Sequence, residues 1–106
     1  GRTSEATPLF QKSLEIRRRQ LGENHPETAS SYNNLATNLA AMGKSREAAE
    51  TLEKALSFYR EHARDNPMEF ATCLSNLGTI LQTQGRYTEA QRRFLEALSY
   101  CEITSP

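Results

Sequence analysis

Apolar and small residues recur along the chain at spacings of three and four residues, and no segment alternates apolar and polar residues as a strand does. Such a stripe covers one face of a helix with about 3.6 residues per turn. The stripes therefore predict an all-α chain of five antiparallel helices joined by short loops. Their expected ranges are about Ser4–Gln20, Glu27–Met42, Arg46–Arg64, Met68–Gln84 and Thr88–Ile103.

The pattern repeats with a fixed offset of 42 residues. The segment Gly43–Ala48 (GKSREA) recurs as Gly85–Ala90 (GRYTEA), and Gly1–Ala6 (GRTSEA) opens the chain with the same motif. A repeat of this length, made of two helices, is typical of solenoid proteins, which bury a continuous core by stacking similar units. The apolar positions that keep the offset are Phe10, Leu52 and Phe94; Leu14, Leu56 and Leu98; Tyr32 and Leu74; and Leu35 and Leu77.

Small residues in the repeat predict where two helices come closest. Ala36 and Gly78 occupy equivalent positions on the first helix of a pair, and Ala48 and Ala90 do so on the second. Such residues let two backbones approach while neighbouring Leu and Phe side chains fill the remaining space.

Glycine and proline mark the expected ends of these helices. Gly43 and Gly85 stand where a helix has to end and reverse, and the left-handed backbone conformation used there is cheapest for glycine. Pro26 and Pro67 come just before a new stripe, where a missing N–H costs little. His25 is placed to hydrogen-bond the start of the helix that follows it.

In this register the chain begins on the second helix of a pair, as a piece of one longer array. We expect residues 1–26 to contain the second helix of a truncated repeat, and residues 27–67 and 68–106 to form two repeats. Each end then lacks a covering helix, which would allow a homodimer to form through the uncapped ends. The apolar residues expected to be partly exposed there are Leu9, Phe10, Leu14, Leu95, Leu98 and Ile103.

Charge and composition argue against several classes of function. The chain has 13 Lys and Arg and 13 Asp and Glu, whereas binding to nucleic acids or anionic membranes usually needs a basic excess. We find neither a signal peptide nor an apolar run of the ~20 residues that a membrane span needs. Two cysteines, without a CxxC or Cys/His cluster, indicate a reduced, cytoplasmic compartment and no metal site. No Gly-rich phosphate loop or catalytic constellation is present, so we expect no cofactor and no enzymatic activity.

Three features allow two interpretations each. The basic run Arg17–Arg19, flanked by Glu15 and Glu23, either binds an acidic partner or nucleic acid, or forms a solvated helix face near a C-terminus. Tyr59 with its neighbour Phe58, and Tyr100 late in the last helix, either form an aromatic cage or pack between repeats. Cys73 and Cys101 either pack as small hydrophobic residues or act as nucleophiles. We favour the structural interpretation for all three.

The repeat resembles the tetratricopeptide repeat (TPR), and Tyr87 fits the aromatic position after its turn, whereas Ser45 and Thr3 depart from it. The offset exceeds the usual repeat of about 34 residues. Together with Leu21–Ala29, which leads into Asn33-Asn34-Leu35-Ala36, it is similar to the kinesin-light-chain-like branch. The resemblance implies a right-handed superhelical solenoid of antiparallel helix pairs. It also implies a protein-interaction module without catalysis. The positions that match the family pattern are Tyr32 and Leu74, Leu35 and Leu77, Ala36 and Gly78, Leu39 and Leu81, Gly43 and Gly85, Ala48 and Ala90, Leu52 and Phe94, and Ala55 and Ala97.

By this resemblance the first helix of each pair lines a concave groove that holds an extended peptide or a partner helix. Asn34 and Asn76 are equivalent, and an amide offers donors and an acceptor to a peptide backbone; alternatively each Asn bonds a neighbouring helix or meets water. The groove has no cation to clamp a terminal carboxylate. The alternative function is a structural spacer or self-association segment. The candidate binding residues are Asn33, Asn34, Thr37, Ser75, Asn76 and Thr79.

Overall fold

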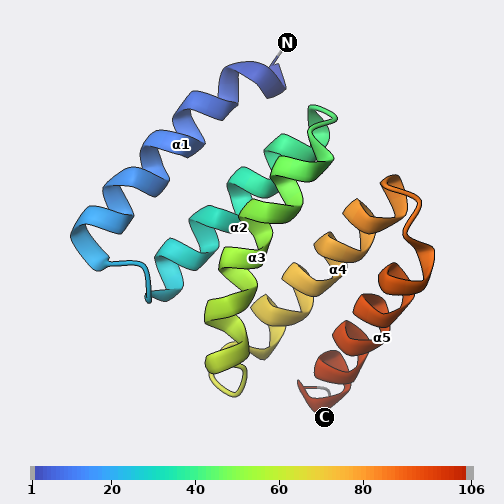
Figure 1. Cartoon of the computed structure of the whole chain (residues 1–106). Coiled ribbons are helices and arrows are strands. Elements are labelled where there is room, and N and C mark those ends of the chain that lie inside the picture. The colour runs from blue at the N-terminus through green and yellow to red at the C-terminus, as the bar shows by residue number, and fades with distance from the viewer. Residues whose placement is uncertain (1, 105–106) are drawn as a thin grey trace.

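The described part of the chain folds into five helices that follow one another in antiparallel order. The computed structural model describes residues 2–104, with side chains for residues 4–101, and within that range it contains no strand. Each helix packs against the next, and α2 also touches α4 (Figure 1). All five predicted helices are thereby confirmed, as α1 (Arg2–Leu21), α2 (Pro26–Ala41), α3 (Ser45–Glu61), α4 (Pro67–Thr83) and α5 (Tyr87–Thr104).

Helices α2 and α4 end in the same type of hydrogen-bonded turn. Gly43 and Gly85 have φ angles of 81° and 79°, in the left-handed region that favours glycine. The amide of Lys44 donates to the carbonyl of Leu39 at 2.9 Å, and the amide of Gly43 donates to the carbonyl of Ala40 at 3.0 Å. These two bonds form a Schellman motif. The two predicted turn glycines are confirmed.

The same two helices also begin alike, because Pro26 and Pro67 are their first residues. Before α2, Nδ1 of His25 accepts a hydrogen bond from the amide of Glu27 at 3.1 Å. This bond satisfies one of the backbone donors left free at a helix start. The expected role of His25 is confirmed.

Helix α3 is shorter than predicted, since it ends at Glu61 rather than at Arg64. The amides of Asp65 and Asn66 both donate to the carbonyl of His62, at 3.2 and 3.1 Å. These bonds close a turn in place of a further helical turn. The predicted apolar stripe ends at Tyr59, before this turn, and therefore does not fix where the helix ends.

Small residues bring the paired helices together as predicted. Ala36 on α2 and Ala48 on α3 are fully buried. On α4, a Cβ atom added at Gly78 would lie 2.8 Å from the Phe94 ring of α5, so only glycine fits beside that ring. The structure thus explains why one repeat combines Ala36 with Leu52 where the other combines Gly78 with Phe94.

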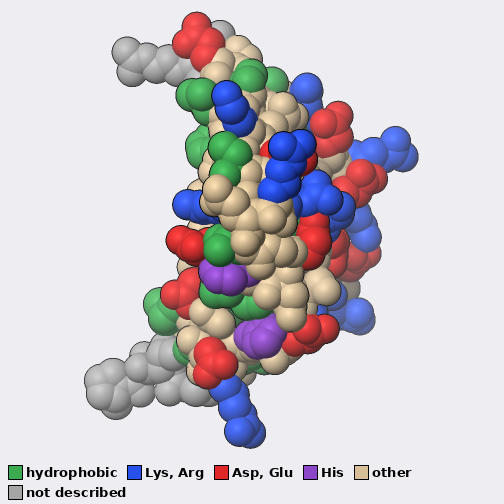
Figure 2. All heavy atoms as spheres, turned by 90° about the vertical axis from the view of Figure 1, so that its left-hand side faces the viewer, with side chains coloured by type: hydrophobic (Ala, Val, Ile, Leu, Met, Phe, Trp, Pro, Cys, Tyr) green, Lys and Arg blue, Asp and Glu red, His purple; other side chains and the backbone are tan. Residues whose placement is uncertain are grey.

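The outer sides of α1 and α5 leave apolar side chains exposed. Leu9 on α1 is 71% exposed, and Leu95 and Leu98 on α5 are 60% and 53% exposed. The expectation for Leu14 was wrong, because α2 covers it and leaves it 7% exposed. Figure 2 views the side on which α1 lies and shows hydrophobic side chains among charged ones. Phe10 is half-buried, and Gly1 and the side chain of Ile103 lie outside the described residues.

The joint between α1 and α2 is more polar than the joint between α3 and α4. Thr28 donates its hydroxyl hydrogen to the carbonyl of Gly22 at 2.7 Å, and Nη1 of Arg17 donates to Oγ of Ser31, also at 2.7 Å. The equivalent positions of α4 are apolar, with the exception of the weakly polar Cys73 thiol. The buried polar residues Thr28, Ser31 and Asn38 of α2 correspond, at the 42-residue offset, to Phe70, Cys73 and Ile80 of α4.

Candidate peptide-binding surface

All six candidate binding residues lie on α2 and α4, which run in the same direction through the molecule (Figure 1). Asn34, Thr37 and Thr79 are exposed to solvent. The other three are half-buried. We call this set, with Ser30 and Thr72 at the start of the two helices, the α2–α4 surface. It comprises Ser30, Asn33, Asn34, Thr37, Thr72, Ser75, Asn76 and Thr79.

Two asparagines join the helices across this surface. Nδ2 of Asn76 donates to Oδ1 of Asn33 at 2.9 Å. Asn34 occupies the position equivalent to Asn76, yet its exposed side chain makes no hydrogen bond within the described residues. Asn76 therefore helps to hold α4 beside α2, whereas the amide of Asn34 keeps its donors and acceptor for solvent or a ligand.

The threonines of the surface direct their hydroxyl hydrogens into their own helices. Thr37 donates to the carbonyl of Asn33 at 2.9 Å, and Thr79 donates to the carbonyl of Ser75 at 3.1 Å. Thr72 does the same toward the carbonyl at position 68, at 3.0 Å. Each hydroxyl oxygen can still accept a hydrogen bond. The surface is therefore rich in acceptors.

A cavity lies on each side of α2. The cavity between α1 and α2 has a volume of about 290 Å³, and that between α2 and α4 has a volume of about 170 Å³. The cavity between α1 and α2 is lined by Phe10, Asn34, Thr37, Asn38 and Ala41, and the cavity between α2 and α4 by Ser30, Asn33, Tyr59, Met68, Glu69 and Thr72.

The sequence analysis did not identify Met68 or Glu69 as candidate site residues. The signal that could have found Glu69 is its position 42 residues after Glu27.

Family models match both halves of the chain, one tetratricopeptide repeat model over residues 1–61 and another over residues 70–105. The chain belongs to the tetratricopeptide repeat family. TPR repeats are generally protein-interaction modules and non-catalytic scaffolds. No match to a curated protein sequence was found.

Solved structures share this TPR fold at low sequence identity. BtubC (BKLC) from P. vanneervenii is 22% identical, with a TM-score of 0.88 over 95% of this chain and 41% of its own. The nearly identical TPR-like repeats assigned to a kinesin light chain of Podospora anserina are 24% identical, with a TM-score of 0.80 over 100% of this chain and 50% of theirs. The N-terminal domain of STI-1 from C. elegans is 22% identical, with a TM-score of 0.64 over 94% of this chain and 87% of its own.

These likenesses establish the fold. The first two structures confirm the kinesin-light-chain-like resemblance at that level, and the present chain spans half or less of their length. Among the described residues, no helix combines the length and the apolar character that crossing a bilayer requires.

The two helices that form the α2–α4 surface carry few charges, and these are all negative. Neither α2 nor α4 contains a Lys or Arg residue. Their only charged residues are Glu27 and Glu69, each in the first turn of its helix. A terminal carboxylate would find no cation on these two helices.

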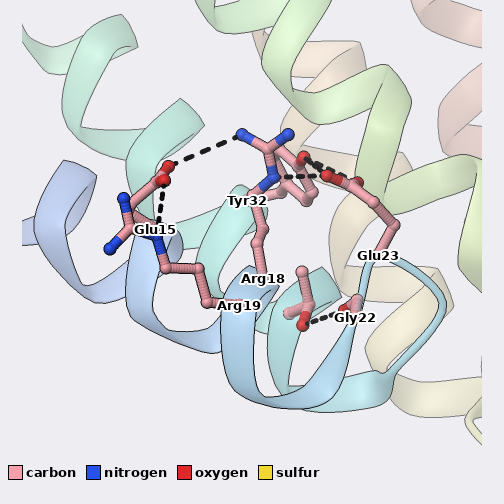
Figure 3. A network of polar contacts seen from close by, with 7 residues as sticks. Glu15, Arg18, Arg19, Gly22, Glu23 and Tyr32 are labelled. Carbon is pink, nitrogen blue, oxygen red and sulfur yellow. Dashed lines mark hydrogen bonds and ion pairs between the residues drawn. The ribbon is translucent and has the colours of Figure 1, made fainter.

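The basic run of α1 is occupied by contacts within the molecule. Figure 3 shows Arg18 between the carboxylates of Glu15 and Glu23, with which it forms ion pairs. Arg19 pairs with Glu15 at 3.2 Å, and Arg17 faces α2. These contacts support the structural interpretation of the run as a solvated helix face near a C-terminus.

Tyr32 belongs to the same network (Figure 3), because its hydroxyl donates to both carboxylate oxygens of Glu23, at 2.9 and 2.8 Å. The bond from Tyr32, reinforced by Arg18, lowers the pKa of Glu23 below its usual value. Burial, followed by the contact with Glu23, raises the pKa of Tyr32 to about 12. The network ties the loop after α1 to α2.

Tyr59, Phe70 and Cys73 are buried in the interior. The Tyr100 ring lies 4.6 Å from the Phe70 ring, and Tyr59 is 3% exposed. Burial, with a smaller contribution from the charge of Glu69, raises the pKa of Cys73 to about 12, which disfavours the reactive thiolate. Within the described part of the chain, no group of side chains could hold a metal ion.

Proposed function

We propose that the chain is a protein-interaction module that holds an extended peptide against the α2–α4 surface. The observation that carries this proposal is the exposed, uncharged row formed by Asn34, Thr37 and Thr79 on two parallel helices, with a cavity on each side of α2. In this proposal Asn33, Ser75 and Asn76 form the half-buried floor beneath the peptide.

The chemistry of the surface suits a peptide backbone. An extended segment carries N–H donors and C=O acceptors that lose water on binding, and each needs a partner. The amide of Asn34 can donate and accept, and the oxygens of Thr37 and Thr79 can accept from peptide N–H groups. The bond between Asn33 and Asn76 fixes the spacing of the helices in advance, which reduces the cost of ordering on binding.

The proposal treats residues 1–106 as one array, with residues 1–26 containing the second helix of a truncated repeat and residues 27–67 and 68–106 forming two repeats. A reduced, cytoplasmic setting belongs to the same proposal, because neither Cys73 nor Cys101 forms a disulfide within the described residues.

Selection from a phage-displayed library of random dodecapeptides tests this function. We expect wild type to select related sequences and an Asn34→Ala/Thr79→Ala variant to bind them at least about tenfold more weakly, because both changed groups face the peptide. The matched control is Thr88→Ala/Gln91→Ala, which changes two exposed residues of α5. Equal loss in both variants, or no selection by wild type, would refute peptide binding at this surface.

Self-association is the second candidate function, favoured by the exposed Leu9, Leu95 and Leu98. It predicts a concentration-dependent dimer in sedimentation equilibrium. Leu95→Glu/Leu98→Glu should restore the monomer without loss of helix content. A monomer at all concentrations for the wild-type chain would exclude this candidate.

A further inference from the structure

The two acids of the α2–α4 helices occupy equivalent positions but have different neighbours. Glu27 and Glu69 are 42 residues apart and both lie in the first turn of a helix. The residue packed beneath each comes from the preceding helix and differs, since Arg17 of α1 corresponds to Tyr59 of α3 at the same offset. One site therefore contains a built-in cation and the other does not.

Around Glu27 the positive charge is supplied by the chain itself. Nη1 of Arg17 donates to the carbonyl of Glu27 at 3.2 Å and to Oγ of Ser31 at 2.7 Å. Lys12 and Arg17 line the same cavity as Glu27. A basic side chain from a ligand would meet like charges there.

The cavity beside Glu69 has no Lys or Arg among the described residues that line it. The exposed carboxylate forms no ion pair with any described residue, and Tyr59 occupies the place that Arg17 has in the first site. The cavity of about 170 Å³ beside it is also lined by the side chains of Asn33 and Thr72, which carry acceptor oxygens. Met68, 51% exposed, adds an apolar surface.

We propose that the cavity beside Glu69 binds a Lys or Arg side chain of the peptide held on the α2–α4 surface. This inference rests on the proposed function and specifies the ligand as a peptide with a basic residue. Lysine and arginine heads carry only donors, which match a carboxylate and two acceptor oxygens. The long methylene stem of either residue can lie on Met68. The peptide thereby supplies in trans the positive charge that Arg17 supplies within the chain.

The test uses the dodecapeptides selected by wild type. We expect Lys or Arg to be enriched at one position of these sequences. A synthetic copy of one selected peptide should bind Glu69→Gln about tenfold more weakly than wild type in fluorescence anisotropy, because a charge-assisted contact is lost. The same peptide with norleucine or citrulline at the basic position should bind both proteins equally. Glu27→Gln, the matched control, should stay within about twofold of wild type.

The outcomes separate this inference from the proposed function. Selected peptides that depend on Asn34 and Thr79 but lack a preferred basic residue would overturn the inference alone. So would a loss in Glu69→Gln that is equal for the charged and the neutral peptide. Failure of wild type to select any peptide would overturn both proposals. A Glu69→Lys variant should select an acidic residue at the same position, and unchanged selection by that variant would also refute the inference. Circular dichroism should show that each variant is folded, and for the Glu69 variants this is expected because Glu69 is exposed.

Discussion

Exchanging the Gly78–Phe94 pair for the residues found at the equivalent positions, Ala36 and Leu52, tests the packing between α4 and α5. Alanine in place of a helical glycine stabilises a helix by about 1 kcal/mol. At Gly78, however, the added Cβ would lie 2.8 Å from the Phe94 ring. The ring then has to leave its packed position, and overpacking of this kind costs about 1–3 kcal/mol. We therefore expect Gly78→Ala to lower the free energy of unfolding by about 1 kcal/mol, against its helix propensity.

The double variant distinguishes this clash from other causes. Phe94→Leu alone leaves a void beside Gly78 and should cost about 1–2 kcal/mol. Gly78→Ala/Phe94→Leu reproduces the packing of the other repeat and should return to within about 1 kcal/mol of wild type, which gives a coupling energy of about 2 kcal/mol. Urea denaturation followed by circular dichroism measures all three variants. If the costs of the two single variants add up to the cost of the double variant within about 0.5 kcal/mol, the contact is refuted.

Three further predictions follow from the core, the turns and the polar network. Leu35→Ala and Leu77→Ala should each lower the free energy of unfolding by about 2–5 kcal/mol in urea denaturation, because both side chains are buried; costs below about 1 kcal/mol would contradict the helix register. Gly43→Ala should cost about 1–2 kcal/mol in the same assay, since φ is 81° there, and an unchanged stability would argue against that conformation. The lowered pKa of Glu23 means that its contribution to stability is present above its unfolded pKa of about 4.3 and is lost as the pH falls through the folded value. Tyr32→Phe should therefore reduce the acid-induced fall in melting temperature between neutral pH and about pH 3, and identical pH profiles for both proteins would refute this linkage.

The helices could be predicted because the signals that define them are local. The apolar stripe fixes which face of each helix is buried, and Gly43 and Pro67 mark where helices end and begin. Leu14 was assigned wrongly because its burial depends on how closely α2 covers α1, which the spacing of apolar residues along one helix does not contain. The end of α3 at Glu61 depends on a hydrogen-bonded turn after the stripe.

The candidate site was predicted less completely, because a repeat equates positions but not their surroundings. Asn34 and Asn76 are equivalent in sequence, yet only Asn76 bonds across to Asn33. Which partner an amide meets depends on the stagger between α2 and α4, and no single-helix pattern reports that stagger. The sequence shows that Arg17 and Tyr59 occupy equivalent positions in the repeat. Only the structure shows that Tyr59 lines a cavity beside Glu69.

The polar contacts between α1 and α2 disfavour misassembled chains in which α2 and α4 are exchanged. A misassembled or domain-swapped chain that set α4 against α1 would place the thiol of Cys73 where Arg17 needs the hydroxyl of Ser31. Leaving a charged donor without its partner costs about 1–3 kcal/mol or more. In the reverse exchange α2 would take the place of α4. Thr28 and Ser31 would then face the side of α3 that packs on α4, and their hydroxyl groups would lack partners. Buried polarity at one joint thus specifies the order of assembly, so that each helix pair is selected for its own place in the stack.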